Sequence, residues 1–83
     1  MGQASRRKPK RLAKKLVAIR SKLGLSQNEL IKHLGLEDEL TQARVSAYER
    51  GIREPSLLVL LAYARLVGIS TDVLIDDKLN LSK

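Results

Sequence analysis

The side chains best suited to chemistry in this chain are hydrogen-bonding groups on one short predicted helix. Thr41 is a helix N-cap residue and Gly51 a helix stop, and between them only Val45 and Tyr48 have the spacing of a core-facing stripe. The other positions should point outward, namely Gln42, Ala43, Arg44, Ser46 and Ala47. A helix with so narrow an apolar stripe is suited to binding another molecule.

A second capped helix comes just before it. Ser26 and Glu29 have the spacing of a capping box, in which each side chain bonds the other residue's backbone amide. Gly35 ends this helix, and its apolar stripe consists of Leu30, Ile31 and Leu34. Two short capped helices on either side of a turn can present the second helix to a DNA groove.

No group of side chains suits catalysis or metal binding. The chain has no cysteine, and its one histidine, His33, has no partner at ligand spacing, so it is interpreted as a helix-surface residue. Asp76 and Asp77 lack a partner pair for acid–base chemistry and are interpreted as a solvated terminus. We therefore predict no enzyme activity, metal, cofactor or small-molecule substrate.

Positive charge is concentrated near the N-terminus. Residues 1–25 hold nine of the sixteen Lys and Arg and no Asp or Glu, although the net charge of the whole chain is only +7. Such a block suits a polyanion, since each neutralised phosphate releases counterions; the alternative is a solvated tail that aids solubility. With only two aromatic residues, stacking on single strands or RNA is disfavoured, and duplex DNA is the expected partner.

Eighty-three residues suffice for one small domain, whose first helix begins near Pro9 and ends at Gly24. Helical spacing predicts a core stripe of Leu12, Leu16, Ile19 and Leu23. It places Arg11, Lys15 and Lys22 on another face. Binding of this basic helix to an anionic membrane is the alternative, but its apolar face lacks the Trp or Phe typical of membrane binders.

Two more helices are predicted in the second half of the chain. Ser56, which follows Pro55, is the N-cap of a helix over residues 57–67 that is apolar almost all round and belongs in the core or at a subunit contact. Gly68 ends that helix, and Thr71 begins a short fifth one.

The sequence thus predicts an all-α domain of five helices over residues 9–76. It follows a flexible basic arm of residues 1–8 and precedes a tail of residues 77–83, which is expected to fray. No run approaches the roughly 18 apolar residues of a membrane span, and the basic start lacks a signal-peptide core. We expect a soluble, unprocessed cytoplasmic protein.

From about Leu12 to Ile75 the chain resembles the phage-repressor-like helix-turn-helix family, the Cro/C1 or XRE class of lambda-repressor-like domains. The segments that carry the resemblance are LGLSQNELIKHLG from residue 23, VSAYERG from 45, REPSLLVLLAYARLVGIS from 53 and TDVLI from 71. The resemblance implies that helices 2 and 3 form the helix-turn-helix and that helix 3 enters the major groove of duplex DNA.

The resemblance also implies which residues contact bases. Gln42 is the best base reader, because its amide can donate and accept at once, as adenine N6 and N7 require. Arg44 could reach guanine or a phosphate, while Ala43 and Ala47 could offer methyl groups to thymine.

Phosphate contacts are implied for two groups of residues. Gln27 resembles a family glutamine that binds a phosphate and can steady Gln42, and it lies with Ser26 at a helix N-terminus that favours phosphate oxygens. The other expected contacts are Ser46, Arg50, Arg53 and, at the N-terminal end of the chain, Arg6, Arg7, Lys8, Lys10 and Arg11.

Two further features follow from the family comparison. Arg20 and Glu49 match a family pair and should form a partly buried ion pair that locks the first helix to the third. Between Gly35 and Val45 the chain has about four more residues than the family usually has. This longer turn, Leu36 to Leu40, contains three acids, so it should bulge away from DNA, change the tilt of the reading helix or extend the preceding helix.

The expected function is sequence-specific DNA binding by a small prokaryotic or phage-type transcriptional repressor, associated with the nucleoid. Because one short helix reads only about four base pairs, we expect a homodimer on a near-palindromic operator. Its contact should involve the fifth helix and tail, through Leu74, Leu79 or Leu81. The alternative is a protein-interaction module, such as an antitoxin or accessory factor, that docks a partner through the acidic turn and apolar tail.

Overall fold

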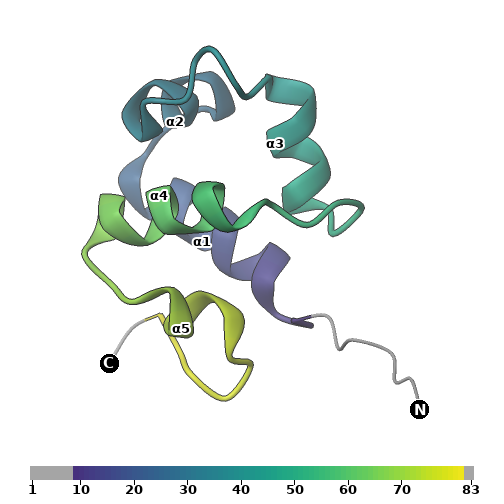
Figure 1. Cartoon of the computed structure of the whole chain (residues 1–83), viewed down its shortest axis with the longest axis vertical. Coiled ribbons are helices and arrows are strands. Elements are labelled where there is room, and N and C mark those ends of the chain that lie inside the picture. Colours follow the sequence, from purple (N-terminus) through teal and green to yellow (C-terminus); the bar gives the residue numbers. More distant parts are fainter. Residues whose placement is uncertain (1–8, 82–83) are drawn as a thin grey trace.

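A computed structural model describes residues 9–81, whose regular secondary structure consists of five α-helices (Figure 1). They are α1 (Leu12–Leu23), α2 (Gln27–Leu34), α3 (Gln42–Glu49), α4 (Leu57–Val67) and α5 (Thr71–Ile75). The predicted all-α fold is confirmed. Arg6, Arg7 and Lys8 lie outside the described residues. No helix within residues 9–81 combines the length and apolar character that crossing a membrane requires.

The helix ends follow local capping signals. The Ser26 hydroxyl accepts a hydrogen bond from the Glu29 amide at 3.0 Å, and the Glu29 carboxylate accepts one from the Ser26 amide at 2.7 Å. Thr41 and Ser56 cap α3 and α4 through their hydroxyls. Ser70, rather than the predicted Thr71, caps α5, because its hydroxyl accepts from the Asp72 amide. Local side-chain chemistry therefore sets most of the boundaries.

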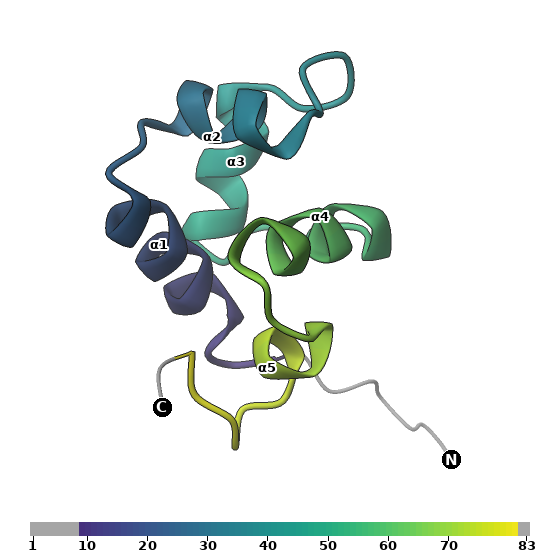
Figure 2. The same cartoon turned by 90° about the vertical axis from the view of Figure 1, so that its left-hand side faces the viewer.

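Each helix contributes one large, fully buried side chain to the core. These side chains are Leu16, Leu30, Val45, Tyr63 and Leu74, in the order α1 to α5. Helix α3 packs against α1 and α2, while α5 packs against α1 and α4, so α2 and α3 stand together at one end of the domain (Figures 1 and 2). The expectation that Leu74 is a dimer contact is therefore wrong, because Leu74 is fully buried within the domain.

Lys15 does not lie on the exposed polar face of α1 that the sequence predicts. This residue is only 3% exposed, and its ammonium group donates to the carbonyl oxygens of Val73 at 2.7 Å and Asp76 at 2.9 Å. Burial lowers the pKa of Lys15. The last carbonyls of a helix lack intrahelical partners and attract a cation. Lys15 therefore holds the C-terminal end of α5 against α1.

The C-terminal segment, residues 77–81, closes over the start of α1. Both carboxylate oxygens of Asp77 accept hydrogen bonds, at 3.0 Å each, from the backbone amides of Lys10 and Arg11. The Arg11 guanidinium donates to the Asp77 carbonyl and to the Asn80 side chain, both at 2.6 Å. Leu81 packs against the core.

These contacts overturn two predictions. The domain does not end at Asp76, and Asp77 is not a solvated terminus, because its carboxylate binds the backbone amides of Lys10 and Arg11 just before α1. Helix α1 also begins later than predicted, at Leu12, and its N-cap residue, Arg11, makes no side-chain cap of its own. A hydrogen bond to a residue as distant as Asp77 leaves no local sequence signal.

Asp77→Asn should lower the melting temperature (Tm) at neutral pH, because it removes the negative charge at the N-terminus of α1. The hydrogen bonds from the Lys10 and Arg11 amides hold the pKa of Asp77 below its ordinary value. Its stabilising effect is therefore complete above the unfolded pKa of about 3.9 and is lost as the pH falls through the lower folded pKa.

Thermal melts followed by circular dichroism test this. The Tm difference between the wild type and Asp77→Asn should shrink once the pH falls below about 4. The control is Glu37→Gln at an exposed position, which should change Tm little at any pH. A Tm difference that is the same at pH 7 and pH 2 would show that the Asp77 charge does not stabilise the start of α1.

Candidate nucleic-acid interface

Helix α3 presents its first turn to solvent. Gln42, Ala43 and Arg44 are exposed, whereas Val45 and Tyr48 are buried. Ser46 and Ala47, which were also expected to contact DNA, are half-buried one turn further along. Figure 1 shows α3 at the edge of the domain, next to α2. The residues most open to a ligand are thus the three at the N-terminal end of α3.

Glu49, the last residue of α3, binds side chains from both α1 and α2. Arg20 donates to its two carboxylate oxygens, from Nε at 2.7 Å and from Nη2 at 2.9 Å. The Gln27 side-chain amide donates to the same carboxylate at 3.1 Å. The Glu49 side chain is 6% exposed and that of Arg20 22%. One buried carboxylate thereby joins the three helices at this end of the domain.

These hydrogen bonds limit the other contacts that the Arg20 and Gln27 side chains can make. The hydrogen bond to Glu49 raises the pKa of Arg20, and Arg20 also donates to the Leu25 carbonyl at 3.0 Å, so its guanidinium is committed within the protein. The Gln27 amide was expected to steady Gln42. In the structure it bonds Glu49 instead, so Gln27 supports α3 at the end opposite to Gln42.

The longer turn before α3 is held by two leucines. The backbone amides of Glu39 and Leu40 both donate to the Leu36 carbonyl at 2.9 Å, which closes a tight turn after α2 has ended. Leu40 is only 6% exposed and Leu36 is half-buried, while the three acids between them are exposed. The extra residues are therefore a separate turn and not an extension of α2.

Leu36 and Leu40 are the positioning residues that sequence reasoning missed. Both pack with the core, and Leu40 comes directly before Thr41, the N-cap of α3. Their burial fixes where α3 starts. The sequence does contain a signal for this burial, because two leucines four residues apart lie on the same side of a turn whose other residues are acidic.

The Lys and Arg residues that the sequence predicts to bind phosphates fall into two groups. Arg44, Arg50 and Arg53 are exposed on α3 and the loop after it, and Lys10 lies near Arg53, since both line the same small hollow. By contrast, the Arg11 guanidinium is turned to the C-terminal segment and bound there. Arg11 therefore does not join the other cations, and its role in the structure is to hold residues 77–80 against the start of α1.

Tyr63 lies fully buried near the ion pair. Burial, and secondly the charge of Glu49, raise the pKa of Tyr63. Its hydroxyl has no hydrogen-bond partner among residues 9–81. Tyr63 is therefore a neutral core residue with no role at the surface.

Arg20→Ala should destabilise the domain by about 2–4 kcal/mol, because it leaves the buried Glu49 carboxylate without its cation. For a domain of this size, that loss should lower Tm by more than roughly 10 °C. Arg20→Lys keeps the charge but loses the two-point hydrogen bonding. Its Tm should therefore lie between that of Arg20→Ala and that of the wild type. Lys14→Ala, at an exposed position of α1, is the matched control. An Arg20→Ala melt equal to that of the control would mean that the pair does not hold α1 to α3.

Comparison with known proteins gives one family. The helix-turn-helix model of the Cro/C1 type, or XRE family, matches residues 16–74, well over half of the chain. No curated protein and no solved structure matches the chain. The matched residues include all of α2, the turn and α3, together with the Glu49 carboxylate that joins them to α1. The chain belongs to the Cro/C1-type helix-turn-helix family of DNA-binding regulators.

Proposed function

We propose that this protein is a transcriptional repressor that binds one specific operator and acts by occupying it. The observation that supports this most directly is the first turn of α3, whose polar side chains are exposed while its last residue is fixed to α1 and α2. A reading helix needs both properties, because base contacts require exposed groups held in one orientation.

Gln42 is the proposed base reader. It is the first residue of α3, where it also lies next to the free backbone amides of the helix start. Its amide matches the donor and acceptor of an adenine in the major groove. Arg44 is proposed for guanine or phosphate, and the exposed methyl group of Ala43 for thymine.

Phosphates are proposed to lie on both sides of α3. On one side is the start of α2, with Ser26 and Gln27. On the other are Arg50, Arg53 and Lys10, all exposed. The three acids of the turn are also exposed. They would repel the phosphates of the DNA backbone, so they favour a bound orientation in which the turn faces away from DNA.

Gln42→Ala should reduce affinity for the duplex that the wild type prefers by about 5- to 150-fold, the equivalent of one lost two-point base contact. It should leave binding to random duplex and the slope of log K against log salt unchanged. Arg53→Ala is the matched comparison, since loss of a phosphate contact should weaken both kinds of binding and reduce the salt slope by about one.

Fluorescence anisotropy at several salt concentrations measures both effects. If Gln42→Ala weakens specific and random binding equally, or weakens neither, then α3 does not read the operator through Gln42.

We further propose that the repressor is a dimer and that its contact lies at the N-terminal end of α4. The most exposed large apolar residues in the described chain are Leu57 and Leu58, at 78% and 73%, followed by Ile52 at 63%. All three follow α3 closely in the chain, and the start of α4 projects from the domain in Figure 2. Burying such residues against a second copy favours association and would keep two reading helices on one face of the DNA.

The double variant Leu57→Ser, Leu58→Ser should weaken self-association at least tenfold, because it removes apolar side chains from the centre of the proposed contact. Sedimentation velocity over a concentration series measures this. The control is Leu79→Ser in the C-terminal segment, which is 39% exposed and should leave association unchanged. The opposite result, in which only the control variant dissociates, would place the contact on the C-terminal segment.

A further inference from the structure

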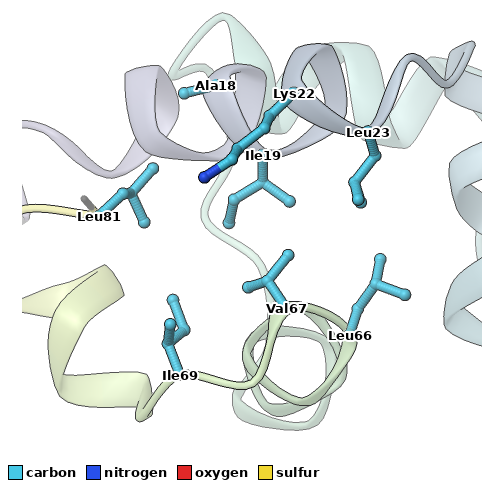
Figure 3. A pocket seen from close by; sticks show the side chains of 8 residues that line it. All are labelled: Ala18, Ile19, Lys22, Leu23, Leu66, Val67, Ile69 and Leu81. Atoms are coloured by element: carbon cyan, nitrogen blue, oxygen red, sulfur yellow. The ribbon is translucent and has the colours of Figure 1, made fainter. Parts of the chain in front are cut away.

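A groove of about 640 Å³ runs between the C-terminal halves of α1 and α4 (Figure 3). One wall comes from α1 with Ile19 and Leu23, and the other from α4 with Leu66 and Val67. Its volume lies in the range of small-molecule sites in proteins, about 300–1,000 Å³. The C-terminal ends of α1 and α4 lie on the side of the domain away from α3, so an occupied groove leaves the reading helix exposed (Figure 1).

The walls keep apolar surface in contact with solvent. Leu66, Val67 and Leu81 are only half-buried, and Leu23 is 41% exposed. Leu81, from the C-terminal segment, bounds the groove beside α1. An aliphatic chain laid along these side chains would be removed from water together with them, which favours binding.

Lys22 is the one charged side chain that lines the groove. Figure 3 shows it extending along the α1 wall of the groove, with its amino group beyond Ile19 in the direction of Leu81. Within residues 9–81 the ion pair recorded is that of Arg20 with Glu49, and Lys22 takes no part in it. The ammonium group of Lys15, on the same helix, already donates to two backbone carbonyl oxygens. The Lys22 ammonium is therefore available to an anion at the groove.

We propose that this groove binds a small amphipathic carboxylate, with its aliphatic chain between α1 and α4 and its carboxylate on Lys22. Charge complementarity selects this class of ligand, because a single cation beside an otherwise apolar trough matches a molecule with one anionic head and one apolar tail. The proposal goes beyond DNA binding and does not depend on it.

Isothermal titration calorimetry of the full-length protein with octanoate and decanoate, below their micellar concentrations, tests the proposal. Saturable binding of one molecule per chain is expected. Each added methylene should tighten Kd by up to about fourfold, because each removes a similar apolar area from water. Methyl NMR spectra should show the resonances of Leu66 and Val67 shifting with the same Kd.

Variants test the contributions of the ligand's carboxylate and of its aliphatic chain separately. Lys22→Gln should weaken decanoate about threefold to fivefold but leave decanol unchanged, while Lys14→Gln, at an exposed position of α1 outside the groove, should affect neither. Ala18→Phe, which places a ring at the exposed groove edge, should abolish binding of both ligands without changing Tm.

Three results would overturn the proposal. The first is the absence of saturable binding. The second is an equal effect of Lys22→Gln and Lys14→Gln on decanoate, which would mean that Lys22 serves only the C-terminal end of α1. The third is self-association that Ala18→Phe abolishes, which would make the groove a contact between copies of this chain.

Discussion

The orientation of the candidate reading helix depends on one buried carboxylate. Glu49 receives two hydrogen bonds from Arg20 on α1 and one from Gln27 on α2, and it is itself the last residue of α3. Helices of eight residues are not stable in isolation, so α2 and α3 depend on packing and on this contact for their existence as well as their placement. Desolvating a carboxylate is costly, and the bidentate arginine and the glutamine offset that cost only in one arrangement of the three helices.

A second set of polar contacts closes the other end of the domain. Asp77 binds the backbone amides just before α1, Arg11 holds the C-terminal segment, and Lys15 satisfies the last carbonyls of α5. The basic residues between Lys10 and Leu25 therefore do not all serve one purpose. Some of them hold the fold together, while exposed ones such as Lys10 remain available to phosphates. Net charge alone could not separate these roles, since it counts both kinds equally.

Local chemistry made much of the fold predictable. Hydroxyl caps at Ser26, Thr41 and Ser56 act within three residues, and helical spacing marks the buried stripe of each helix, so both signals can be read from short stretches. What could not be predicted lies between distant residues. Lys15 is buried because α5 ends against it, and Asp77 binds backbone amides more than sixty residues earlier in the chain. Whether Leu74 meets the core or a partner could not be predicted, because a short amphipathic helix does not show from its sequence which side is buried. For the candidate site, the resemblance supplied the pairing of Arg20 with Glu49, whereas the anchoring of the long turn by Leu36 and Leu40 required the structure.

Helix α3, held by Glu49, is proposed to read a specific duplex. Selection of bound duplexes from a random pool at one known salt concentration tests this claim most directly. We expect enrichment of a near-palindromic consensus whose half-sites lie about one helical turn, roughly 10 base pairs, apart and contain adenine at a position that depends on Gln42. A selected pool that stays as diverse as the starting pool would contradict the claim, because a fixed and exposed reading helix must prefer some sequences over others.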